Sequence, residues 1–204
     1  MRRITLILKG IYAGHTRAEQ RVRVAKKAFS RYYSQSRMAK RAFRVGDKVV
    51  YPHHGAATVE SLQDREMEGS TRKYYILRLS YGDLTLMVPM DGADEVGLRG
   101  VVPKDEIEDV FQILKSRKQA PSPSNWSRRF KNHVEKLRSG DIYQVAEVVK
   151  NLTLRDKDKG LSAGEKRMLS KARQILVSEL TFALNSNEDK AEAMLDEVLG
   201  LTPS

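Results

Sequence analysis

The sequence predicts an α+β protein of two domains, in which a small antiparallel β-barrel precedes an all-α helical bundle. Three observations support this. Short runs rich in β-branched and aromatic residues fill positions 43–101, amphipathic helical patterns fill 124–200, and a Pro/Ser-rich stretch separates them. The chain has 204 residues, of which 40% are hydrophobic and 31% charged, which suits two small globular domains.

The predicted strands are short and closely spaced. Lys48–Tyr51 is a β-rich run that ends at a proline, and Ala57–Glu60 follows after a glycine turn. Residues 74–79 and 84–88 alternate in polarity, and Tyr81–Asp83 supplies the tight turn between them. Because no helical pattern interrupts these runs, we expect a small antiparallel barrel.

The next segment is less definite. Residues 103–117 fit either a short helix or a turn, and 118–124 have the composition of a linker. We therefore predict a first domain over 43–117, a linker over 118–124 and a second domain over 125–200.

The second domain is expected to contain four helices joined by short loops. Capping residues mark their starts, and a Ser–Glu capping box opens the third helix. The predicted caps are Ser124, Asp141, Ser162 with Glu165, and Ser186 with Asp189, and Gly140 and Gly200 mark the ends of the first and last helices.

Charge is unevenly distributed along the chain. The net charge is +11, but residues 1–40 alone contain 11 Lys or Arg and one acidic residue. We predict a basic, disordered extension over 1–42, with two alternatives: a folded functional element, or residues upstream of a true start at Met38. The high pI therefore says little about the folded part, where residues 125–173 form the basic block.

Enzymatic and metal-binding patterns are missing. The chain has no cysteine, and His53 and His54 are adjacent, so in an extended segment they would point to opposite faces. The segment at Gly160–Arg167 departs from a phosphate-binding P-loop in spacing and residue type. We expect no catalytic residues, no metal, no cofactor and no enzyme. No apolar run has the length of a membrane span, and a cytoplasmic location is expected.

Two candidate features lie in the helical part. Basic side chains, among them Arg128, Lys131 and Lys166, lie off the apolar stripes and could bind phosphate or simply be solvated. Trp126 has helical spacing from Phe130, which favours a core position. Its place in the first turn of a helix, beside cations, also fits an exposed aromatic that contacts DNA bases.

Three separated segments resemble one family. Phe43–Gly55 (FRVGDKVVYPHHG), Asn125–Lys131 (NWSRRFK) and Gly160–Leu169 (GLSAGEKRML) are similar to motifs of the CarD/CdnL regulators, over roughly residues 42–200. The resemblance implies a Tudor-like barrel that binds the RNA polymerase β subunit. It also implies a helical domain that contacts promoter DNA at the upstream edge of the melted bubble and stabilises the open complex.

The resemblance also implies roles for individual residues. Trp126 matches the tryptophan that acts as a minor-groove wedge, and Arg128, Lys131 and Lys166 match positions that contact the DNA backbone. Arg65 matches a polymerase-facing basic position. The second polymerase-facing position is Met87 here, which departs from the family and would make an apolar contact. We expect a monomer, and the sequence does not indicate which edge of the barrel would contact polymerase.

Two other function classes remain open. A free-standing architectural DNA-binding protein would bind DNA tightly without polymerase, but the net charge of residues 42–204 is close to neutral. A purely protein-binding adaptor would tolerate charge reversal at Lys166.

Overall fold

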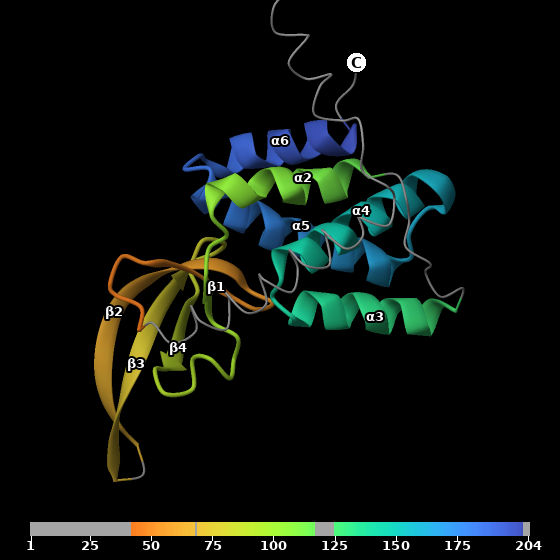
Figure 1. Cartoon of the computed structure of the whole chain (residues 1–204). Helices are drawn as coiled ribbons and strands as arrows, with labels where there is room; N and C mark the ends of the chain where they lie inside the picture. Colours follow the sequence, from red (N-terminus) through yellow and green to blue (C-terminus); the bar gives the residue numbers. More distant parts are fainter. Residues whose placement is uncertain (1–41, 68, 117–124, 202–204) are drawn as a thin grey trace, which may run out of the picture. The chain divides into compact units, whose positions relative to one another are not determined.

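The computed structural model describes residues 42–67, 69–116 and 125–201, which belong to one compact unit (Figure 1). The extension predicted over 1–42 lies, but for its last residue, outside the described residues, and so does the linker at 118–124. The described part is an antiparallel sheet followed by helices. The predicted α+β layout is therefore confirmed.

The sheet contains five strands in the order β4-β3-β2-β1-β5, and each neighbouring pair is antiparallel. The strands are β1 (Lys48–Tyr51), β2 (Gly55–Met67), β3 (Ser70–Leu79), β4 (Thr85–Pro89) and β5 (Arg99–Gly100). Figure 1 shows the long β2–β3 hairpin extending away from the helices. Its tip is rich in charged residues, so the sequence pattern underestimates its length.

The sheet is open, so the small antiparallel barrel predicted from the sequence is not closed. β4 and β5 are its two edges and do not pair with each other. β5 has only two residues, too few to supply a ladder that could close the sheet. A register shift between Val59 and Ser61 marks a bulge in β2, which bends the strand locally.

One face of the sheet carries its own apolar core. Tyr75, Leu77 and Val88 are at most 2% exposed; in the ladder Tyr75 lies between Leu62 and Val88, and Leu77 lies between Val59 and Leu86. These residues alternate with outward-facing ones because successive side chains in a strand point to opposite faces. On the other face Tyr74 and Ile76 of β3 are 7% exposed, whereas Arg65 of β2 and Met87 of β4 remain exposed.

The helices pack into a second core. They are α2 (Ile107–Lys115), which follows the short helix η1 (Lys104–Glu106), then α3 (Trp126–Arg138), α4 (Ile142–Lys159), α5 (Ala163–Ala183) and α6 (Glu188–Leu199). Buried apolar residues from α2, α4, α5 and α6 form one cluster. Residues 103–117, left open between helix and turn, are thus largely helical. The domain boundaries remain a prediction, but α2 packs with the helical core although it precedes the predicted linker.

Side-chain caps set the starts of these helices. The capping box of Ser162 and Glu165 at α5 is confirmed, and Asp141 caps α4 as predicted. Asn125 caps α3, whereas the predicted Ser124 lies outside the described residues. Asn187 caps α6 in place of the predicted Ser186 and Asp189, because its amide oxygen accepts from Lys190 N.

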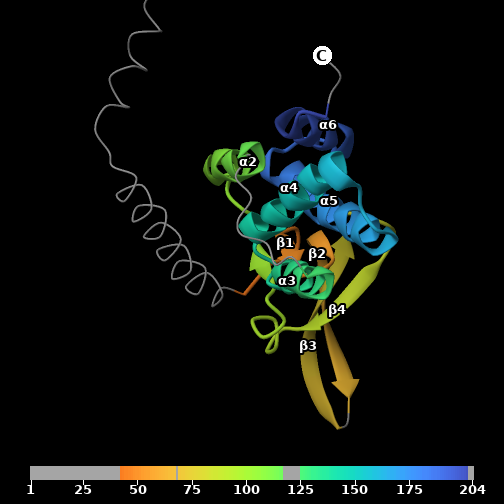
Figure 2. The same ribbon diagram turned by 90° about the vertical axis from the view of Figure 1, so that its right-hand side faces the viewer.

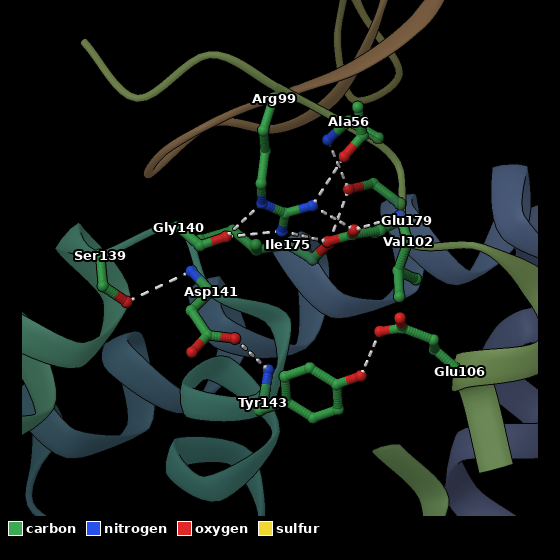
Figure 3. A network of polar contacts seen from close by, with 12 residues as sticks. Ala56, Arg99, Val102, Glu106, Ser139, Gly140, Asp141, Tyr143, Ile175 and Glu179 are labelled. Carbon is green, nitrogen blue, oxygen red and sulfur yellow. Dashed lines mark hydrogen bonds and ion pairs between the residues drawn. The ribbon is translucent and has the colours of Figure 1, made fainter. Parts of the chain in front are cut away.

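A buried ion pair joins the sheet to the helices. Arg99 of β5 donates to both carboxylate oxygens of Glu179 on α5, at 2.6 and 2.8 Å, and to the carbonyl of Gly140 between α3 and α4 (Figure 3). Glu179 is 1% exposed and also accepts from Val102 N at 3.0 Å. The pair therefore holds three segments of the fold together.

Candidate functional site

Trp126 is the large exposed aromatic side chain of the helical domain. Its ring stacks on Phe130 with a centroid distance of 5.1 Å, and 47% of its surface is exposed. Gly164, at the start of α5, lies against both rings, since a Cβ there would be 3.6 Å from Phe130 and 4.0 Å from Trp126. The tryptophan is therefore not part of the helical core but is held at the surface where α3 and α5 begin.

Exposed cations follow the aromatic contact on both helices. Arg128 follows Trp126 by two residues and Lys166 follows Gly164 by two, so each projects about 200° around its helix from the aromatic contact. Both are exposed, and so is Lys131. Within the described residues, none of the three has a carboxylate at ion-pair distance, so their charges remain available to an anion.

Glu165 holds together the elements that carry these residues. Its carboxylate contacts Arg129 of α3 and Arg155 of α4, both at 3.3 Å, and it completes the capping box with Ser162. Burial alone would raise the pKa of Glu165, but hydrogen bonds from Ser162 and Arg129 outweigh it and lower the pKa. The carboxylate is therefore charged at neutral pH and fixes α3 beside the start of α5.

His133 lies in the same interior and carries no charge at neutral pH. It is 5% exposed, and burial, followed by the nearby cations Lys136 and Arg129, lowers its pKa to about 4. A neutral imidazole suits this position because a further positive charge would lie beside a guanidinium. We therefore regard His133 as a packing residue of α3.

The sheet offers a free edge at β4. Among the described residues no strand pairs with its outer side. Leu79 N donates to Leu84 O and Met90 N donates to Lys73 O, and bonded pairs alternate with non-bonded ones along an antiparallel ladder. Met87, opposite Ile76, therefore occupies a non-bonded position, and its backbone N–H and C=O point outward from the sheet.

The same alternation identifies the other outward-facing groups of β4. Thr85 and Pro89 also occupy non-bonded positions, and proline has no N–H to offer. The outward N–H groups of the strand thus belong to Thr85 and Met87, and the Met87 side chain is 47% exposed. This short edge can accept one additional strand.

Arg65 and Met87 share one face of the sheet. Ser61 lies opposite Ile76, which lies opposite Met87, and Arg65 alternates onto the same face of β2 as Ser61. Arg72, which the sequence analysis missed, lies directly opposite Arg65. Two like charges in one cross-strand pair are unfavourable unless an acidic group lies nearby. This face is therefore suited to an acidic partner.

The structure groups the predicted residues into two surfaces. Trp126, Arg128, Lys131 and Lys166 lie on α3 and the start of α5, and Arg65 and Met87 lie on the outer face of the sheet. Figure 2 shows α3 and the β3–β4 part of the sheet from a second side. Sequence spacing could not reveal that Glu165 and Arg99 hold neighbouring elements together, because their ion-pair partners lie 36 and 80 residues away.

Other site types are not indicated by the described residues. They contain no group of three or more His, Asp or Glu side chains arranged to hold a metal ion. None of their helices combines the length and the apolar character that crossing a membrane requires.

Comparison with known proteins gives matches to two family models and to a relative in another organism. Residues 43–102 match the family model "CarD-like/TRCF RID domain", and residues 109–196 match "CarD, C-terminal domain". The "Putative transcription factor YdeB" of Bacillus subtilis (strain 168) is 35% identical over 141 residues, which cover 68% of this chain and 90% of that protein. The two family models meet close to the start of α2.

Proposed function

Since this chain belongs to the CarD-like family of transcription factors, we propose that it binds RNA polymerase and promoter DNA at the same time. In this proposal the sheet domain, which we infer to be Tudor-like and to span 43–117, binds the polymerase β subunit. The helical domain, 125–200, contacts DNA at the upstream edge of the bubble and stabilises the open complex. The segment 118–124 links the two.

The observation that carries the DNA contact is the exposed Trp126, with exposed cations on the two helices that hold it. A side chain that enters the minor groove has a phosphate strand on either side of it, and the groove is about 6 Å wide. Arg128 of α3 and Lys166 of α5 supply charge to phosphates without reading sequence. Stacking on Phe130 fixes the indole before it meets DNA, so little rotational entropy is lost on insertion.

Replacing Trp126 with alanine tests this role. If the indole stabilises melted DNA, the variant loses a contact of about 1–3 kcal/mol, and the open-complex lifetime falls by about five- to a hundredfold. The measurement is the decay of promoter complexes formed by bacterial RNA polymerase after addition of a competitor. Leu201→Ala, which removes an exposed apolar side chain elsewhere, should leave the lifetime unchanged. An unchanged lifetime for Trp126→Ala as well would refute the wedge.

The polymerase contact is proposed to use the free edge of β4. A strand of the partner would receive hydrogen bonds from Thr85 N and Met87 N, and the Met87 side chain would make an apolar contact. The like-charged pair of Arg65 and Arg72 on the same face favours an acidic surface on the partner. Arg72, opposite Arg65, and Ile76, opposite Met87, are four residues apart on β3, which corresponds to about 13 Å.

Substitution of Met87 with proline separates backbone from side-chain effects. Proline removes an outward N–H while leaving the β3–β4 bonds in place, so affinity for the β subunit should fall by about tenfold or more. Met87→Ala keeps the backbone N–H, so it should lose less affinity for the β subunit. Binding can be measured by titrating a labelled chain with core polymerase, after thermal unfolding establishes that both variants are folded. Equal losses in the two variants would mean that the edge is not used.

A free-standing architectural DNA-binding role predicts a different result. The chain truncated to residues 41–204, which form one compact unit, would then bind duplex DNA tightly in a gel shift without polymerase. Our proposal expects weak binding in that experiment, because the sheet domain raises the local concentration of the helical domain on DNA.

A further inference from the structure

The turn between β1 and β2 is clamped between α3 and α5. A Cβ on Gly140, directly after α3, would lie 2.8 Å from Pro52, and a Cβ on Gly55 would lie 2.5 Å from Ser178 Oγ of α5. Ala56 N donates to the same hydroxyl at 2.9 Å. The two imidazoles inside this turn, His53 and His54, therefore keep a fixed position beside both helices.

Two cations of the helical domain lie near this turn, since Arg138 precedes Gly140 by two residues and Lys171 precedes Ile175 by four, and a Cβ on Gly55 would lie 3.3 Å from the Ile175 Cα. Burial lowers the pKa of His53 first, followed by the charge of Arg138 in the last turn of α3. For His54 the causes are burial and then Lys171 of α5. Arg138 and Lys171 are exposed, and neither has an acidic partner at ion-pair distance within the described residues. Two cations and two imidazoles that can donate N–H groups therefore lie at this turn, and neither cation has an acidic partner among the described residues.

This group continues the basic surface that begins at Trp126. Arg138 follows Lys131 by seven residues, so the two lie on the same side of α3 and about 10 Å apart. Lys171 follows Arg167 by four residues, which makes them neighbours on the exposed side of α5. Cations on both helices therefore extend from the tryptophan toward the β1–β2 turn.

His53 has a backbone conformation that histidine rarely adopts. Its φ is +68°, in the left-handed region that glycine occupies without strain. Such a conformation is strained for a non-glycine residue, and the clamp by α3 and α5 holds it in place. The His53 side chain is exposed, so its own packing does not explain why a histidine occupies this strained position.

We propose that His53, His54, Arg138 and Lys171 form a second phosphate-binding patch, through which the sheet domain also touches promoter DNA. This rests on the proposed function, since it assumes that the helical domain binds DNA. Arg138 and Lys171 supply charge, and the imidazoles donate N–H groups to phosphate oxygens. A DNA segment that meets Trp126 at one end would lie along α3 and reach the turn at the other.

The test compares two double variants of the full chain. Arg138→Gln with Lys171→Gln removes the patch cations, and Lys104→Gln with Lys190→Gln removes two exposed charges elsewhere. Fluorescence anisotropy with a labelled DNA duplex over a range of salt concentrations gives the slope of log K against log[salt]. The patch variant should flatten that slope by about 1.8, as expected for two lost phosphate contacts. The control should leave the slope almost unchanged.

Two further variants make the outcome decisive. His53→Gly removes one imidazole while relieving the backbone strain, so it should keep or raise thermal stability yet weaken DNA binding. Lys131→Gln reports on the surface already proposed. If it flattens the slope and the patch variant behaves like the control, the patch is refuted and the proposed function stands. If Lys131→Gln, Lys166→Gln and the patch variant all leave the slope unchanged, the proposed DNA contact fails, and the patch with it.

Discussion

Glu179→Ala is expected to lower the free energy of unfolding by about 3–5 kcal/mol. The substitution leaves the Arg99 guanidinium without its carboxylate and Val102 N without its acceptor, while Arg99 keeps only backbone carbonyls as partners. An uncompensated charge in a buried position is costly because little water can replace the lost partner. Urea titration followed by circular dichroism measures the change.

The control is an exposed glutamate. Glu108 pairs with Lys115 at 3.8 Å with both side chains more than half exposed, so Glu108→Ala should cost less than about 1 kcal/mol. Replacing both members of the buried pair, Arg99→Met with Glu179→Leu, should recover much of the lost stability, because no unpaired charge remains. A cost below about 1 kcal/mol for Glu179→Ala would show that the pair does not hold sheet and helices together.

Glu165→Ala is expected to have an effect of similar size, about 3–5 kcal/mol. It disrupts the capping box of α5 and breaks the contacts of the buried carboxylate with Arg129 of α3 and Arg155 of α4. Because Arg129 follows Trp126 by three residues on α3, the start of that helix should loosen. DNA binding should therefore weaken together with stability, as measured by thermal unfolding and anisotropy on the same variant.

Ser162→Ala isolates the cap from the ion pairs. It removes the hydroxyl that accepts from Glu165 N but keeps both arginine contacts, so it should cost about 1 kcal/mol and leave DNA binding nearly intact. If the two variants cost the same, the ion pairs of Glu165 contribute nothing measurable to the fold.

The features that sequence predicts well here are local ones. The capping box at Ser162, the strand at Lys48–Tyr51 and the helix stop at Gly200 depend on residues within a few positions of each other. Their hydrogen bonds and backbone angles are set by nearest neighbours. The order of strands and helices along the chain could be predicted for the same reason, because each element's pattern lies within a short stretch of sequence.

Features that depend on distant contacts could not be predicted. The spacing of Trp126 and Phe130 is compatible with core and surface alike, and the contact of both rings with Gly164 on another helix decides between them. The predicted barrel does not close, because the two-residue length of β5 follows from tertiary packing rather than from strand propensity. The cation group at the β1–β2 turn likewise joins three elements far apart in the chain.

The outward edge of β4 also constrains self-association. An unpaired strand can pair with the same strand of a second molecule, which is a common route to aggregation. Here the edge has five residues and ends at Pro89, so two copies laid antiparallel could form only a few bonds before the proline rings interrupt the ladder. A short edge ending in proline therefore limits pairing between copies while leaving room for the one partner strand that we propose.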